Sequence, residues 1–257
     1  MNLLDRILET DLLESWIRKN FSNKDKLIVI LGATATGKSA LALKLAEKLQ
    51  TEIISADSMM IYKNFNIGTA KPTPEELARV KHHLVDILEP EEKFNVVDLQ
   101  IAASKIISDL NKRGKIPIVA GGTGLYIQAL IEGYQFSDKS NKSIQSKYKE
   151  TGNLVYDAKV IGLVLDRQEL YKRINLRTRK MFEDGLINEV QSLLNSGINR
   201  NAQAMLGIGY KETLEYIDGK ISLDETIENI SKATRHFAKR QFTWYKRMKY
   251  IDWIFVE

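Results

Sequence analysis

The chain has 257 residues, of which 44% are hydrophobic and 28% charged, and a formal net charge of +5. This is enough for a full hydrophobic core, so we expect one large domain with a small accessory part, in a monomeric, cytoplasmic protein without membrane contact. The absence of cysteine and the presence of only three histidines exclude disulfides and cysteine nucleophiles and argue against a zinc site.

The first 21 residues carry apolar side chains at a helical period, interrupted by acidic residues at Asp5, Glu9, Asp11 and Glu14. These acidic residues argue against a signal or transit peptide. We expect residues 1–26 to form an amphipathic helical extension that docks on the core. A helix that binds a partner is the alternative.

A strand pattern at residues 27–31 and a helix pattern at 38–49 flank the segment Gly32-Ala33-Thr34-Ala35-Thr36-Gly37-Lys38-Ser39. This is a complete G-x-x-x-x-G-K-[ST] loop in the strand-to-helix context that supports it. Its backbone N–H groups and the helix N-terminus favour an oxyanion, Lys38 adds a full charge, and the Ser39 hydroxyl can reach Mg²⁺. The chain is therefore expected to bind a phosphorylated ligand.

Strand and helix patterns alternate along the following residues. We expect a helix at 96–112, a mostly helical stretch after Asp166, and strands at 52–56, 82–88, 116–120, 160–165 and 251–256. This order predicts an α/β fold with a P-loop NTPase-like parallel sheet, helices on both of its faces and a helical C-terminal part. The polar segment 137–157 is the only one that looks foreign to this core.

Two polar side chains follow strands at the edge where such sheets bind ligands. Asp57 ends the second strand and can act as a general base or hold Mg²⁺. Thr123, in a second glycine turn at 121–124, can donate to a phosphate oxygen. The alternative for both residues is a capping role in a turn or helix.

Two cationic patterns lie in the C-terminal half. Arg173 and Arg177 are four residues apart, a spacing that can form a two-pronged clamp on a helix. Residues 231–250 contain seven Lys or Arg and no acidic residue, which suits a phosphate backbone. A solvated helix face is the alternative in both cases.

Several segments together resemble the tRNA dimethylallyltransferases, also called tRNA isopentenyltransferases. The resemblance covers residues 27–133 and 160–253, and its most specific blocks are Ile54–Tyr62, Ile67–Pro72, His82–Asp86, Gly121–Tyr126, Ile208–Glu212 and Thr234–Trp244. It implies transfer of a dimethylallyl group from dimethylallyl diphosphate to the exocyclic amine of adenosine 37, beside the tRNA anticodon.

The resemblance also implies roles for individual residues. Asp57 would be the base, and the diphosphate would be held by the loop 32–39 with Lys38, Thr123, Arg177 and a Mg²⁺ ion near Ser39. The flipped-out adenine and the surrounding tRNA would be bound by Asp57, Ser58, Met59, Met60, Gly207, Ile208, Gly209, Tyr210, Lys211, Glu212, Arg235, Lys239 and Arg240.

The chain departs from this family at two places. Many relatives have Gln where Met60 stands, so a hydrogen bond to the base edge is expected to be missing. The family inserts a helical accessory domain after the residue matching Gly133, followed by an Asn-Asp-Pro segment that touches tRNA. Here only residues 134–159 fill that place, so we expect a shortened remnant of the insertion between core segments 27–133 and 160–257.

Three alternatives remain at this point. An adenylate isopentenyltransferase, acting on free AMP, ADP or ATP, would explain the shortened insertion. A kinase or ATPase is the generic interpretation of the phosphate loop. A catalytically silent RNA-binding relative is the third, although retention of Lys38, Asp57, Thr123 and Arg177 argues against it.

Overall fold

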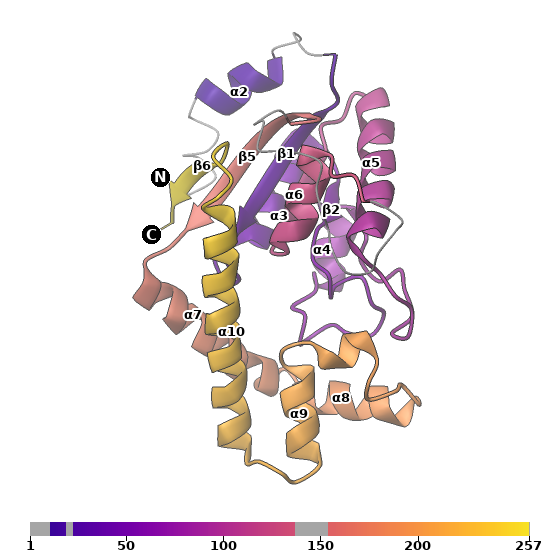
Figure 1. Ribbon diagram of the computed structural model, residues 1–257, viewed down its shortest axis with the longest axis vertical. Helices are drawn as coiled ribbons and strands as arrows, with labels where there is room; N and C mark the ends of the chain where they lie inside the picture. Colours follow the sequence, from indigo (N-terminus) through magenta and orange to yellow (C-terminus); the bar gives the residue numbers. More distant parts are fainter. Residues whose placement is uncertain (1–10, 19–22, 137–153, 257) are drawn as a thin grey trace.

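The computed structural model describes residues 11–18, 23–136 and 154–256. Its centre is a parallel sheet of order β3-β2-β4-β1-β5-β6 (Figure 1). The strands are β1 (Lys26–Gly32), β2 (Ile53–Ser55), β3 (His82–His83), β4 (Ile118–Gly121), β5 (Asp157–Val164) and β6 (Asp252–Phe255). The predicted α/β fold class is confirmed.

The central strand β1 is buried from Leu27 to Gly32, as its continuous apolar sequence predicts for a parallel strand covered on both faces. It pairs with β4, where Ile28 lies opposite Ile118, and with β5, where Lys26 lies opposite Asp157. Because this register begins at Asp157, residues 157–159 belong to the sheet and not to the segment expected to replace the insertion.

Alternate residues of β1 face two separate cores. Ile28 and Ile30 pack on the side covered by α2 (Asp11–Arg18) and α3 (Lys38–Leu49). Leu27, Val29 and Leu31 face the opposite core, which includes residues of α5 (Val96–Lys112) and α6 (Gly124–Glu132). Leu13 of α2 is buried in the first core, so the described part of the N-terminal extension packs on the sheet; residues 1–10 and 19–22 lie outside the described residues.

The strand expected at 82–88 ends after two residues. Leu84 and Asp86 have φ values of 60° and 56°, which extended strands do not allow, and the chain turns there. Before it, a short helix, α4 (Pro74–Arg79), begins at a capping box formed by Thr73 and Glu76.

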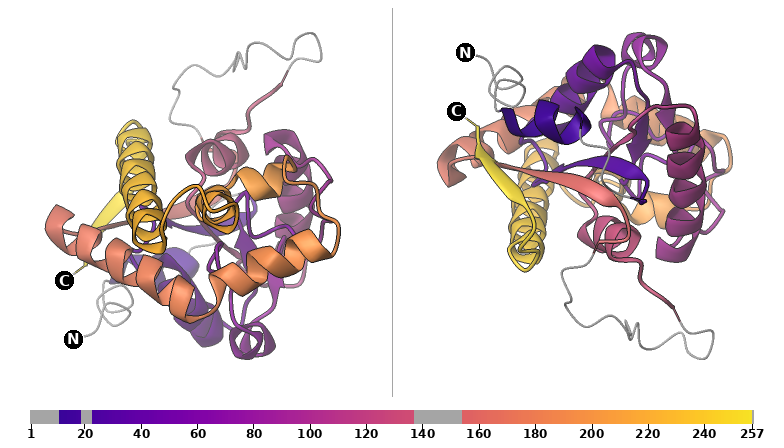
Figure 2. Two further views of the ribbon diagram at one scale, coloured as in Figure 1. Left: turned by 90° about the horizontal axis from the view of Figure 1, so that it is seen from below. Right: turned by 90° about the horizontal axis from the view of Figure 1, so that it is seen from above.

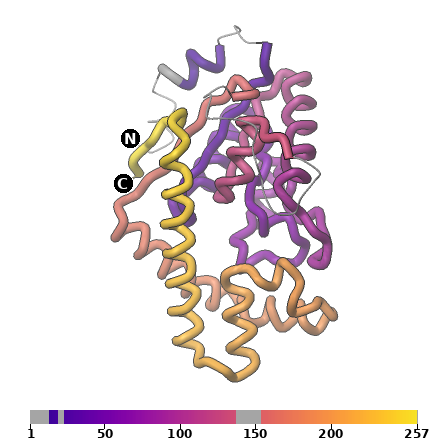
Figure 3. The backbone as a smooth tube through the Cα atoms, in the orientation of Figure 1, coloured from indigo at the N-terminus to yellow at the C-terminus, as the bar shows by residue number. Residues whose placement is uncertain are grey.

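The C-terminal half forms a helical layer at the carboxyl ends of the strands (Figures 1 and 2). It contains α7 (Arg167–Glu183), α8 (Leu186–Asn195), a 3₁₀ turn (Gln203–Leu206), α9 (Tyr210–Ile217) and α10 (Leu223–Tyr245). Figure 3 follows the backbone through these helices and back along α10 to β6. The helix expected within 231–250 begins earlier, at Leu223, because Ser222 and Glu225 form a capping box.

No helix in the described parts of the chain combines the length and apolar character needed to cross a bilayer.

Candidate active site

The loop between β1 and α3 has a backbone that only a few residue types tolerate. Gly32 has φ +151°, and a Cβ there would lie 2.6 Å from the Leu163 carbonyl oxygen. Gly37 has φ +92° and caps α3. The Lys38 Nζ donates to the Ala33 carbonyl at 2.7 Å, so the lysine folds back over the loop that it follows.

Three charged groups converge next to this loop. Arg177, from α7, donates through Nη1 to the Thr34 hydroxyl at 3.2 Å. Burial and the nearby Arg177 lower the pKa of Lys38 to about 8, and Asp57 opposes this shift. Burial also lowers the pKa of Arg177, again against the effect of Asp57. A concentrated positive charge with one carboxylate beside it suits an anionic ligand.

Asp57 and Thr123 approach each other through Ser58. The Asp57 Oδ1 accepts from the Met59 N–H at 2.9 Å, so the expected capping role holds for one carboxylate oxygen. Thr123 is at the N-cap position of α6 but makes no side-chain capping bond. Its Oγ1 instead accepts from the Ser58 N–H at 3.3 Å. The Thr123 hydroxyl is therefore directed toward the end of β2 and not into its own helix.

Asp57, Thr123 and Arg177 line a cavity of about 330 Å³ between the sheet and the helical layer, whereas Lys38 and Ser39 do not line it. Residues expected at the site that line it are Thr34, Ala35, Asp57, Ser58, Met59, Thr123, Arg177, Gly207, Ile208, Tyr210 and Arg240. Gly68, Thr69, Thr234 and Phe237, from two of the blocks that carry the resemblance, also line it without having been predicted individually. Further lining residues outside those blocks are Ile174, Thr178, Met181, Leu206 and Ile230. The cavity thus has a charged end at the phosphate loop and an apolar side formed by α7 and α10.

Other residues expected to bind tRNA do not line this cavity: Met60, Gly209, Lys211, Glu212, Arg235 and Lys239. Glu212 is buried, and its Oε2 accepts from the Gly209 N–H at 2.8 Å, which makes it a cap of α9. Lys211 lies 3.5 Å from the same carboxylate. Glu212 is therefore buried and caps a helix, and it does not lie on the surface where it could contact tRNA.

The spacing of Arg173 and Arg177 allowed a two-pronged clamp or a solvated helix face, and the two side chains have different surroundings. Arg173 pairs with Glu169 on its own helix, with Nε 3.0 Å from Oε1, and only Arg177 lines the cavity. The two side chains differ because Arg177 meets Thr34 of the phosphate loop, whereas Arg173 has an acidic neighbour one turn away.

The basic residues of α10 are divided among different surroundings. Arg240 lines the cavity of Asp57. Lys239 and Lys246 line a second cavity of about 310 Å³, together with Arg167. Arg235 is held by Glu228 at 2.8 Å and by the Asn175 amide oxygen at 2.7 Å. The basic residues of 231–250, including Lys246 directly after α10, therefore do not share one surface.

Comparison with known proteins agrees with this geometry. The sequence model of the family described as IPP transferase matches residues 60–155 and 137–248. The chain belongs to the IPP transferase family. The resemblance seen in the sequence is thereby confirmed.

Relatives of this IPP transferase cover most of its length. It is 41% identical to the tRNA dimethylallyltransferase of Carboxydothermus hydrogenoformans, over 89% of this chain and 91% of the relative. It is 40% identical to that of Geobacillus thermodenitrificans, over 89% of this chain and 90% of the relative. The first alignment runs over 285 positions, so the relative has several tens of residues without a counterpart here.

Solved structures share the fold. The full-length tRNA isopentenylpyrophosphate transferase of Bacillus halodurans superposes with a TM-score of 0.81, at 35% identity and 90% coverage of both chains. The tRNA delta(2)-isopentenylpyrophosphate transferase of Staphylococcus epidermidis superposes with a TM-score of 0.79, at 36% identity, over 90% of this chain and 93% of the other.

One buried residue of this IPP transferase connects the parts of the site and was not predicted individually. The Gln241 Oε1 accepts from the Thr34 N–H at 2.8 Å, and its Nε2 donates to the Gly122 carbonyl at 2.8 Å. It lies within the block Thr234–Trp244, which was the only signal in the sequence that could have pointed to it.

Proposed function

We propose that this protein transfers a dimethylallyl group from dimethylallyl diphosphate to the exocyclic amine of adenosine 37 in the anticodon loop of tRNA. One observation carries the proposal: Asp57, Thr123 and Arg177 line one cavity beside a phosphate loop, in a chain of the IPP transferase family. The names of its relatives agree with this reaction.

The donor's diphosphate fits the charged end of the cavity. Arg177 lines that end with Thr34 and Ala35 of the loop 32–39, Lys38 adds positive charge beside it, and Thr123 supplies a hydroxyl. Negative charge grows on the diphosphate as the allylic C–O bond breaks, and preorganised donors in a closed site stabilise that charge. Ile174, Met181 and Phe237 offer an apolar surface for the five-carbon group.

A divalent ion, which we take to be Mg²⁺, fits this arrangement as an ion carried by the diphosphate. Within the described residues no group of three or more His, Cys, Asp or Glu side chains could hold a metal by itself. Mg²⁺ usually keeps several waters and takes few protein ligands beside substrate phosphates. The exposed Ser39 hydroxyl, at the start of α3, would be its protein ligand, and the ion would neutralise part of the diphosphate charge.

In this proposal Asp57 is the base that prepares the acceptor. The amine nitrogen forms a bond to C1 of the dimethylallyl group while the diphosphate leaves with the electrons of the C–O bond. The amine proton passes to the Asp57 carboxylate, whose Oδ1 is held by Met59. A positioned base contributes roughly 10²- to 10⁴-fold. The adenine must leave its stack to reach this carboxylate.

Outside the cavity, basic side chains of α10 and the shortened insertion would bind the tRNA. Arg240 lies at the cavity, and exposed Lys239 lies one residue away on α10. Only residues 134–156, of which 137–153 lie outside the described residues, precede β5 where the family has its accessory domain, and we expect weaker or less selective tRNA binding as a result. A monomer would suffice, because the groups of the site come from one chain.

A transfer assay tests the function. Purified protein is incubated with labelled dimethylallyl diphosphate, Mg²⁺ and unmodified tRNA, with AMP, ADP and ATP as competing acceptors. We expect label in tRNA at the adenosine beside the anticodon. Label in the free nucleotides alone would assign the chain to the adenylate enzymes. Binding of tRNA without transfer, at high enzyme and tRNA concentration, would mark a silent relative.

A further inference from the structure

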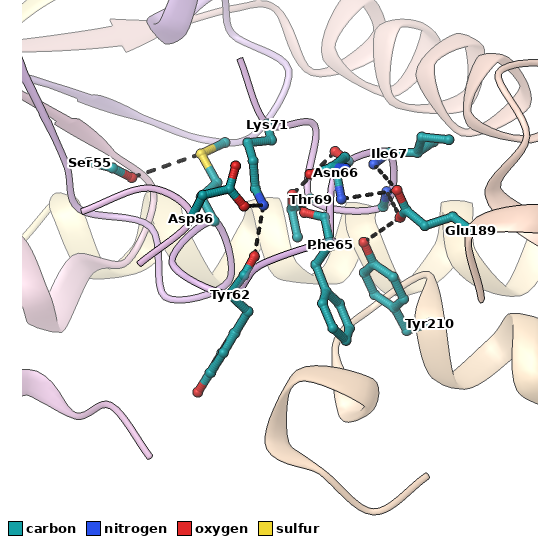
Figure 4. Close-up of polar contacts among 12 residues, drawn as sticks. Ser55, Tyr62, Phe65, Asn66, Ile67, Thr69, Lys71, Asp86, Glu189 and Tyr210 are labelled. Atoms are coloured by element: carbon teal, nitrogen blue, oxygen red, sulfur yellow. Dashed lines mark hydrogen bonds and ion pairs between the residues drawn. The ribbon is translucent and has the colours of Figure 1, made fainter. Parts of the chain in front are cut away.

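A carboxylate on α8 lies directly behind one wall of the cavity. The Glu189 Oε2 accepts from the backbone N–H groups of Asn66, at 3.0 Å, and Ile67, at 2.8 Å. Its Oε1 accepts from the Tyr210 hydroxyl at 2.7 Å and from the Gly68 N–H at 3.3 Å. Figure 4 shows this side chain between the loop and the tyrosine. Three successive backbone donors therefore converge on one side chain.

The loop that donates these hydrogen bonds is held at its two ends by other contacts. Thr69 Oγ1 donates to the Phe65 carbonyl at 2.6 Å, and the buried Lys71 Nζ donates to the Tyr62 carbonyl at 2.7 Å. Between these ends, the N–H groups of residues 66–68 all donate to Glu189. The middle of the loop thus depends on a residue more than 100 positions away.

Tyr210 and this loop are packed against each other. A Cβ added at Gly68 would lie 2.5 Å from Cε2 of the Tyr210 ring, so only glycine allows this approach. The Tyr210 ring also contacts the Phe65 ring, at a centroid distance of 4.7 Å. Burial and Glu189 raise the pKa of the Tyr210 phenol, which keeps it protonated as a donor.

Gly68, Thr69 and Tyr210 line the cavity, but Glu189 does not. They lie with Ile208 and Gly207, and a Cβ at Gly207 would meet the Met59 side chain at 2.5 Å. The residues of this wall carry no charge, whereas Arg177 brings a cation to the cavity beside Thr34. The occupant of this wall is therefore the acceptor base and not the diphosphate.

We propose that Glu189 is a positioning residue for the acceptor. It holds residues 66–68 and Tyr210 in one fixed arrangement and so sets the shape of the wall against which the flipped base lies. The identity of that occupant rests on the function proposed above. Glu189 touches no substrate itself, so its effect is transmitted through the loop and the tyrosine.

The test compares Glu189→Gln and Tyr210→Phe with Glu215→Gln, an exposed glutamate on the helix that carries Tyr210. An amide has one accepting oxygen, so Glu189→Gln leaves at least one loop N–H facing an NH₂ group. We expect the KM for tRNA to rise about tenfold, the size expected for a lost charged hydrogen bond. The kcat and the KM for the donor should stay within about twofold of wild type.

Tyr210→Phe removes one bond of the four and should raise the KM for tRNA by less. Glu215→Gln should leave all constants unchanged. An unchanged KM for tRNA in Glu189→Gln would overturn the proposal. So would a fall in kcat with equal changes for both substrates, because general loosening of the fold has that signature.

A second measurement needs no catalysis. Amide hydrogen exchange at residues 66–68, followed by NMR in the substrate-free protein, should accelerate in Glu189→Gln but not in Glu215→Gln. Unchanged exchange would show that Glu189 does not hold residues 66–68, even in an active enzyme. If exchange is faster in Glu189→Gln but the wild-type protein transfers nothing to tRNA, Glu189 holds the loop and the proposed function is wrong.

Discussion

The side-chain amide of Gln241 accepts a hydrogen bond from the Thr34 N–H at 2.8 Å, joining α10 to the phosphate loop across 207 positions of sequence. Its other end donates to Gly122, in the turn that leads to Thr123. A Cβ at Gly122 would lie 2.3 Å from the Gln241 Nε2, which shows how closely this turn approaches the amide. Gln241 therefore connects the phosphate loop directly to the turn that carries Thr123, in addition to the pairing of β1 with β4.

Gln241→Met should keep the volume and remove both hydrogen bonds. Leaving buried partners unsatisfied costs about 1–3 kcal/mol each, so we expect a lower Tm and a higher KM for the donor. Thermal unfolding and donor kinetics measure the two effects. Gln191→Met, at an exposed glutamine of α8, is the control and should change neither. Unchanged donor kinetics in Gln241→Met would contradict its role at the loop.

The Asp57→Asn variant separates the proposed role of Asp57 as a base from its role as a hydrogen-bond acceptor in the turn. Asparagine keeps an oxygen that can accept from the Met59 N–H, but it cannot take a proton from the amine. We expect transfer to fall about 10²- to 10⁴-fold while donor binding persists. Single-turnover transfer and equilibrium donor binding check this. Asp57→Ala should lose transfer to a similar extent and also lower the stability of the turn. Near-normal transfer in Asp57→Asn would remove Asp57 from the base role.

Donor affinity should depend on pH through Lys38. Its pKa is lowered to about 8 in the free protein, so Lys38 is charged below that pH and loses its proton above it. The bound diphosphate favours the charged form, which raises this pKa in the complex. Affinity should therefore be level between pH 7 and about 8 and then fall by up to about tenfold per pH unit.

Calorimetry at several pH values measures this, with proton uptake on binding expected above pH 8. Lys38→Met should bind the donor weakly at every pH and show no such step. A step of equal size in Lys38→Met would assign the titration to another group.

A substitution at the exposed Lys239 tests whether tRNA contacts this part of α10. If its ammonium neutralises one phosphate, Lys239→Gln should weaken tRNA binding and reduce the slope of log affinity against log salt by roughly one. Binding titrations at several salt concentrations give this slope. Lys48→Gln, at an exposed lysine of α3, should leave the slope unchanged. An equal effect of the two substitutions would show that only net charge matters.

Much of the fold follows from local patterns. The helices at 38–49 and 96–112 have the predicted bounds, because their apolar period and their N-terminal signals are properties of neighbouring residues. The strand expected at 82–88 ended early, since positive φ values at Leu84 and Asp86 arise from contacts made in the folded chain. Local sequence carries no comparable signal for them.

The candidate site divides in the same way. The phosphate loop, Asp57 and Thr123 were predictable because a motif and the ends of parallel strands mark them. Spacing treats Arg173 and Arg177 alike, yet only Arg177 has the phosphate loop beside it. Glu189 carried no motif, and its three loop partners are more than 100 positions away.

The sequence by itself determined the parallel α/β core, the phosphate loop and the family, because these rest on short motifs and on periodicity within single elements. Tertiary structure alone decided which cations face the cavity and which buried polar side chains hold its walls. Those outcomes depend on burial and hydrogen bonding between distant segments. Gln241 and Glu189 acquire their partners only when α10 and α8 pack against the loops of the sheet.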